Sequence, residues 1–248
     1  MALNPLTMVK TGGSIFIALP LVVMLLSLLP VYILFVRKVA ITAILNVLRA
    51  VCLFVFLQYL TLYFIQPGVP AMQTAFRLAQ FTLVFYLFKL MMSGSQAKDL
   101  MNMMLVSFLS VVITIFSLKG ITAYSGILII IEASVLTVLA FVVLLQLISN
   151  KQTAMPNEPG FWIAGGMLCF FGMVVFMEAI AGSQLELSQQ IQQEKGFIVT
   201  VADILRMVFF IVAASIAGKN RKNNNDHEEP SMPPLPPLPS RPPFKIKY

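Results

Sequence analysis

Long apolar stretches separated by short polar breaks dominate this sequence. Seven of them are long enough to form helices across a hydrocarbon core about 30 Å thick. Strands of a membrane barrel would be much shorter, so the pattern predicts an all-α polytopic membrane protein with a seven-helix transmembrane bundle. The predicted spans are 14–36, 40–65, 70–92, 99–118, 123–149, 160–181 and 197–218.

The breaks between the spans carry charged or turn-forming residues, as in the proline- and glycine-containing segment 66–70. The break at 183–195 is longer and rich in Gln and Glu. We interpret it as a solvated loop rather than a helical extension, because its apolar positions are few. In the sixth span, small residues are expected to permit close helix packing. These residues are Gly165, Gly166 and Gly172.

Composition supports the membrane class. Hydrophobic residues make up 58% of the 248 residues, charged residues only 11%, and the mean hydropathy is +0.88. Soluble domains carry about 25% charged residues. The net charge of +7 does not indicate nucleic-acid binding, because the lysines and arginines lie mostly at span ends and in the C-terminal tail. Their distribution predicts that the N-terminus is outside and the C-terminus cytoplasmic.

Apart from Lys89 and Asp99 near span ends, six ionisable side chains interrupt the apolar stretches. A charge near the centre of a spanning helix costs roughly 2.5–3.5 kcal/mol on insertion scales. Three acids and three bases therefore predict pairing inside the bundle. The six are Arg49, Arg77, Glu132, Glu178, Asp203 and Arg206.

Helical spacing places several of these groups on shared faces. Gln73, Arg77 and Gln80 recur at i, i+4 and i+7, and Asp203 and Arg206 are three residues apart. Arg77 lies roughly 10 Å below the outer end of the third span. Such polar stripes in apolar helices point toward a bundle interior or a water-filled cavity.

We therefore predict an outward-opening polar pocket between the third, fifth, sixth and seventh spans. Its candidate residues are Arg77, Glu132, Glu178, Asp203, Arg206, Gln73 and Gln80. Arg77 is expected to pair with Glu132 or Glu178, and Asp203 with Arg206. Three interpretations stay open: a ligand or ion site, structural charge pairing without a ligand, and proton or ion conduction.

Several kinds of chemistry lack their residues in this sequence. Both cysteines, Cys52 and Cys169, lie in predicted spans, and the only histidine, His227, lies in the tail. We predict no metal site, no haem and no other cofactor. No hydrolase or protease motif is present, and the last span offers Arg206 rather than a Schiff-base lysine. The expectation is a protein that is not an enzyme.

The tail, 219–248, differs abruptly from the spans and is predicted to be disordered and cytoplasmic. Its prolines favour an extended spacer, and a PxxPxR pattern within them is more simply a tether than a docking motif. The last residues alternate apolar and basic, which suits either strand addition to a partner or contact with anionic lipid. The partner-binding candidates are Pro236, Pro239, Arg241, Phe244, Ile246 and Tyr248.

Three segments, 129–136, 159–168 and 202–207, resemble the membrane module of certain bacterial sensor histidine kinases. The resemblance covers the last three spans best and the first four only by pattern. It implies a bacterial inner-membrane protein with a cytoplasmic C-terminus. No kinase follows residue 218 in this sequence, so the resemblance implies a stand-alone module whose output comes from another protein.

Two regions are thus expected: a transmembrane domain at 1–218 and a tail at 219–248. The leading hypothesis is a non-enzymatic membrane sensor or scaffold with an intramembrane polar site and a tail that recruits a cytoplasmic partner. A small ion-coupled transporter and a structural subunit of an envelope complex are the alternatives. The expected partners are the lipid bilayer and a cytoplasmic protein, without nucleic acid. Homo-oligomers and larger membrane complexes stay open.

Overall fold

The computed structural model describes residues 15–36, 42–64, 70–120, 126–149, 155–183 and 189–226. Within these ranges the chain is helical, with seven α-helices and one short 3-10 turn. They are α2 (Ile15–Val36), α3 (Ala43–Phe64), α4 (Pro70–Met91), α5 (Ser95–Lys119), α6 (Gly126–Ser149), η2 (Met155–Asn157), α7 (Pro159–Ser183) and α8 (Gln189–Asp226).

Six of these helices are long and apolar enough to cross a membrane: α2, α3, α5, α6, α7 and α8. The prediction of an all-helical membrane protein is therefore confirmed for the described part of the chain. α4 has 22 residues but is not among the six. Its polar positions, including Gln73, Arg77 and Gln80, lower its hydropathy.

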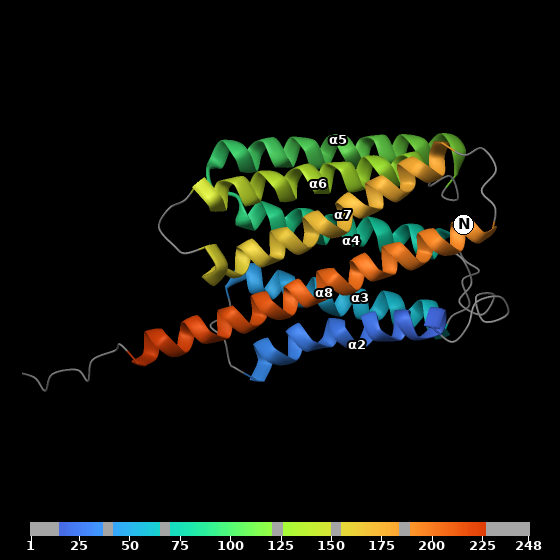
Figure 1. Ribbon diagram of the computed structural model, residues 1–248. Coiled ribbons are helices and arrows are strands. Elements are labelled where there is room, and N and C mark those ends of the chain that lie inside the picture. Colours follow the sequence, from blue (N-terminus) through green and yellow to red (C-terminus); the bar gives the residue numbers. More distant parts are fainter. Residues whose placement is uncertain are drawn as a thin grey trace, which may run out of the picture.

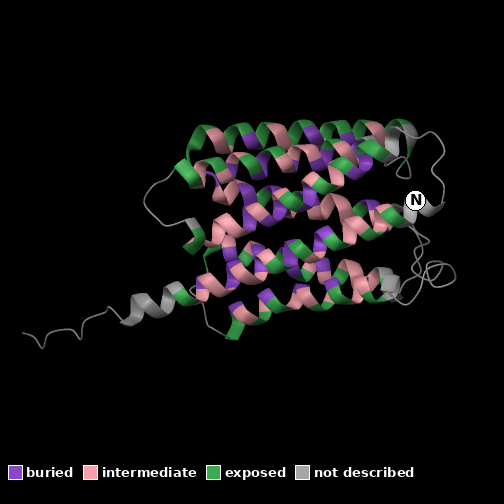
Figure 2. Cartoon of the chain, in the orientation of Figure 1, coloured by how far each residue is buried: buried purple, intermediate pink, exposed green. Residues whose placement is uncertain are grey.

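Six helices form a closed ring in which each packs on the next, in the order α2, α3, α4, α6, α7, α8 and back to α2. Figure 1 shows these helices from the side. α5 lies outside this ring and packs against α4. Buried residues are distributed along all of the helices, and α5 is largely exposed (Figure 2). Large apolar side chains such as Leu25, Met103 and Phe176 are exposed, as expected of helices that face lipid.

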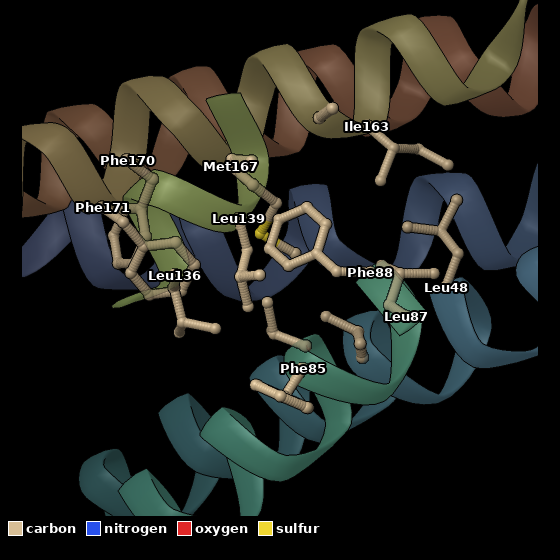
Figure 3. Close-up of a cluster of buried hydrophobic side chains, with 14 of the residues drawn as sticks. Leu48, Phe85, Leu87, Phe88, Leu136, Leu139, Ile163, Met167, Phe170 and Phe171 are labelled. Atoms are coloured by element: carbon tan, nitrogen blue, oxygen red, sulfur yellow. The ribbon is translucent and has the colours of Figure 1, made fainter. Parts of the chain in front are cut away.

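Large apolar side chains fill one part of the ring interior, which Figure 3 shows. They come from α3, α4, α6 and α7, so four helices meet in one packed cluster. We call this region the apolar half. It contains Leu48, Phe85, Leu87, Phe88, Leu136, Leu139, Ile163 and Met167.

Two glycines allow α7 and α8 to approach closely. A Cβ on Gly166 would lie 2.7 Å from Cβ of Phe209, and one on Gly165 would lie 3.2 Å from the ring of Phe209. Real Cβ atoms essentially never come within 3.0 Å of another heavy atom, so this packing requires Gly166. The same role was expected of Gly172, but a Cβ added there would have no atom within 4 Å, so that expectation is wrong.

Arg49 links α3 to the end of α2. Its Nη2 atom donates a hydrogen bond of 2.7 Å to the carbonyl oxygen of Leu34. Leu34 lies in the last turn of α2, where carbonyl oxygens lack partners within the helix. Arg49 therefore satisfies a helix end with a cation, the charge that a helix C-terminus favours.

α8 is longer at both ends than the sequence pattern predicted. Residues 189–195 are helical, so the loop interpretation is wrong for this part of the break. Gln and Glu are good helix formers, and their propensity outweighs the scarcity of apolar positions. The helix also continues through 219–226, where the tail was predicted to be disordered, because no proline or glycine interrupts it. The segment 227–248 lies outside the described residues.

Candidate polar site inside the helix ring

A cavity of about 130 Å³ lies between five of the six ring helices. Its walls combine charged, amide and apolar side chains, and we call this region the polar half. The lining residues are Gln58 and Tyr59 of α3, Arg77 and Gln80 of α4, Ile129, Glu132 and Ala133 of α6, Phe170, Phe171, Val174 and Glu178 of α7, and Asp203 of α8.

Five of the seven candidate site residues thus line one cavity: Arg77, Gln80, Glu132, Glu178 and Asp203. They come from the four helices that the stripes indicated, α4, α6, α7 and α8. Gln73 does not line the cavity, although it lies one turn from Arg77 on α4. Arg206 lies behind the wall.

Arg206 contacts two residues of the cavity wall, Asp203 and Phe170. Nη2 of Arg206 lies 2.5 Å from Oδ1 of Asp203, so the i,i+3 pair expected from the sequence is present. Oδ2 of Asp203 accepts a hydrogen bond of 2.8 Å from the Tyr59 hydroxyl. The guanidinium carbon of Arg206 lies 4.0 Å from the ring centre of Phe170, a cation–π contact. Phe170 belongs to the cavity wall.

Arg206 is almost fully enclosed, with 1% of its side chain exposed. Within the described part of the chain, its Nε and Nη1 atoms have no hydrogen-bond partner. An ion buried this deeply costs several kcal/mol unless an opposite charge compensates it. Asp203 supplies that charge, and the Phe170 ring adds a further favourable contact.

Glu178 forms an ion pair of 2.7 Å with Lys195 of α8. The sequence had suggested Arg77 as its partner, which is wrong. The extended start of α8 explains the difference, because it brings Lys195 alongside the last turns of α7. No ion pair joins Arg77 to Glu132 either, so neither predicted pair of Arg77 is present among the described residues.

Arg77 presents its charge to the cavity together with two amides. Arg77, Gln58 and Gln80 all line the cavity. Within the described residues, none of the three side chains takes part in a hydrogen bond or ion pair. Their N–H groups are therefore available to a molecule inside the cavity.

Gln58 and Tyr59 were missed at the level of the sequence. The other candidates stood out as intramembrane charges or polar stripes, whereas these two residues are neighbours on α3 without a repeating polar pattern. The sequence feature that could have identified them is the occurrence of adjacent Gln and Tyr residues in an otherwise apolar span, because polar groups in such a span tend to face the bundle interior.

No cluster of three or more potential metal ligands occurs among the described residues. What the polar half offers is hydrogen bonding and charge from several helices around one small volume. The proposed partner-binding residues of the tail, from Pro236 to Tyr248, lie outside the described part of the chain.

Comparisons of this sequence with protein-family models, with curated proteins and with solved structures found no match.

Proposed function

We propose that this chain is a seven-span membrane sensor or scaffold module that binds a small solute in the polar half. The solute-bound arrangement would be read by a cytoplasmic partner at the C-terminal side. This proposal includes a membrane crossing by α4. α4 packs between α3 and α6, and its Phe81, Phe85 and Phe88 side chains are buried. Its polar face meets the cavity instead of lipid, which accounts for its lower hydropathy.

The observation that supports the proposal most is the position of Arg77 in the cavity wall, without an ion pair to a described residue. A cation within a spanning helix is costly, and such residues are rare unless they pair or serve a function. If the charges served packing alone, Arg77 would be expected to have an acidic partner. Arg77 instead lines the cavity without an ion pair in the described part of the chain. The side-chain amides of Gln58 and Gln80 line the same cavity, and no described residue forms a hydrogen bond with them.

α8 offers a route from the cavity to the partner. Asp203 of α8 lines the cavity, and the same helix continues to Asp226, beyond the ends of its neighbours (Figure 1). A solute that favours one position of Asp203 would shift the helix between pre-existing arrangements. The tail, with its spacer and terminal apolar residues, would then present the change. A stand-alone relative of the sensor-kinase membrane modules would work in this way.

The proposed location is a bacterial inner membrane, with the N-terminus outside and the C-terminus in the cytoplasm. The basis is the distribution of lysine and arginine between the two sides of the spans. The cavity lies toward the outer side in this orientation, so it would sample solutes of the cell envelope.

A solute screen on the full chain in lipid nanodiscs tests the proposal. Pools of amino acids, carboxylates, amines, polyols and inorganic ions are added, and thermal unfolding is followed. At least one pool is expected to raise the Tm in a saturable manner, because binding to the folded state stabilises it. Ala133→Leu, which fills the cavity, should abolish the shift.

Val138→Leu is the matched control, since Val138 lies on the same helix and is exposed. If no pool shifts the Tm, and Ala133→Leu is at least as stable as the parent protein, the cavity is only a packing defect and the proposal fails. The transporter alternative predicts a different result: solute uptake into proteoliposomes that depends on pH and is lost in Glu132→Gln.

A further inference from the structure

Arg77, which lines the cavity without an ion pair to any described residue, indicates the chemical class of the solute. We infer that the polar half binds a small monocarboxylate, with the carboxylate group against Arg77. The inference rests on the proposed function and narrows it. Arg77 lines the cavity with Gln58 and Gln80, and all three have N–H groups that no described residue engages.

The donor set suits a carboxylate better than a simple anion. A guanidinium is planar and presents its N–H groups as a fork that matches two carboxylate oxygens. The amide groups of Gln58 and Gln80 can donate to the remaining lone pairs of the same oxygens. A halide could use the charge but not the fork, and it would leave most of the cavity unfilled.

The other charges of the cavity oppose a multiply charged anion. Three acidic residues, Glu132, Glu178 and Asp203, line the same volume. Lys195 and Arg206 form ion pairs with two of them, so among the described residues Arg77 is the cation that lines the cavity without an ion pair. A phosphate dianion would meet these acids at short range in a medium of low dielectric constant, where like charges repel strongly.

The volume limits the size of the solute. An engineered protein cavity of about 150 Å³ accommodates benzene, so a cavity of similar size admits about six non-hydrogen atoms. The cavity here measures about 130 Å³. Its apolar wall includes Ile129, Ala133 and Val174, which can contact a methyl or short alkyl group. Acetate, propionate, glycine and alanine fit these limits, whereas sugars and nucleotides do not.

The experiment is a set of equilibrium titrations of the full chain in nanodiscs with acetate, propionate, glycine and L-alanine. Arg77→Gln is expected to weaken carboxylate binding by about tenfold to a hundredfold, the effect of losing charge-assisted hydrogen bonds. Arg77→Lys should retain part of the affinity, because it keeps the charge without the fork. A preference for the amino acids over acetate would assign the acidic side of the cavity to their ammonium group.

Lys89→Gln provides the matched control. It also removes one positive charge from α4, but Lys89 bonds to Asn102 of α5 and does not line the cavity. Its titrations should equal those of the parent protein. If Arg77→Gln fails to fold, Gln80→Leu carries the same test, with an expected severalfold loss of carboxylate affinity.

Equal carboxylate affinity in the parent protein and in Arg77→Gln overturns the inference. So does saturable binding of amines, polyols, chloride or phosphate with none of carboxylates. In the second case the proposed solute sensor survives with another class of solute. If no class binds at all, the inference and the proposed function fail together.

Discussion

The polar and apolar halves of the ring interior share the helices α3, α4, α6 and α7 but are filled in opposite ways. On α3, Leu48 lies in the apolar half and Tyr59 in the polar half; on α4, the corresponding residues are Phe88 and Arg77. In each pair the two residues are eleven positions apart, about three turns or roughly 16 Å along one helical face. The inward face of each helix therefore changes from packed apolar side chains to polar or charged ones along its length.

The contrast between the two halves distinguishes the packing that stabilises the ring from the polar cavity that is costly to keep. In a bilayer, helices associate through close van der Waals packing and hydrogen bonds, since lipid is as apolar as leucine. The apolar half and the Gly166–Phe209 contact supply such packing. The polar half leaves a cavity and retains charges that are costly in a membrane. The first half stabilises the ring, and the second is where we propose that a solute binds.

The largest effect should come from Asp203→Leu, which tests how much of the polar half is structural. The substitution leaves Arg206 buried without its counter-charge. Breaking a buried pair from one side costs about 3–5 kcal/mol, so we expect a loss of this size in the free energy of unfolding. Titration with SDS in mixed micelles measures it.

The double variant Asp203→Leu/Arg206→Met is the control for that result, because it removes both charges and keeps apolar volume. It should recover most of the stability that the single variant loses, as replacement of a buried pair by apolar residues is often neutral. If the double variant is as unstable as the single one, the loss comes from the poor fit of a leucine side chain at this position and not from the orphaned charge of Arg206.

Phe88→Ala tests the apolar half directly. Phe88 is fully buried among residues from three other helices. Truncation leaves a void, and because the transfer term is small in lipid, the void alone should cost about 2–3 kcal/mol of unfolding free energy. Phe176→Ala is the comparison, since Phe176 is exposed on α7 and should change the same measurement little. Equal losses in both would mean that the apolar half is not the stabilising part.

Gly166→Ala should have a smaller but definite effect. The added Cβ would clash with Phe209 and force α7 and α8 apart, a form of overpacking that costs about 1–2 kcal/mol. Gly172→Ala adds the same atom to the same helix in open space and should be neutral or slightly stabilising. The measurement is the free energy of unfolding of both variants under the same conditions. An unchanged value for Gly166→Ala would contradict the close contact between Gly166 and Phe209.

The sequence could predict the helices and the inward direction of their charges more fully than the contacts between helices. Apolar runs of about twenty residues leave little choice but spanning helices, so the helix positions follow from length. Charges on one helical face also predict an inward direction, as with Arg77 and Asp203. These inferences need only one helix at a time.

Pairing between helices could not be predicted in the same way. Glu178 pairs with Lys195 because α8 starts earlier than hydropathy indicates, and a polar helical extension has no signal in an apolarity pattern. Tyr59 and Asp203 are 144 residues apart in the sequence, so the local sequence around either residue does not predict their hydrogen bond. The early start of α8 decides the first case, and the placement of α3 and α8 around the cavity decides the second. Periodicity within one helix carries no information about either.

Arg77→Gln should have the smallest effect on stability, and that is what sharpens the comparison between the two halves. Arg77 has no ion pair to lose within the described residues, and a neutral amide is less costly in a membrane than a cation. We expect the free energy of unfolding to change by no more than about 0.5 kcal/mol or to rise slightly. The same SDS titration measures it, with Asp203→Leu as the reference. A loss as large as that of Asp203→Leu would show that Arg77 supports the fold, and the polar half would then differ from the apolar half only in the type of packing. A stable variant would instead mean that the charge of Arg77 is kept for something other than stability.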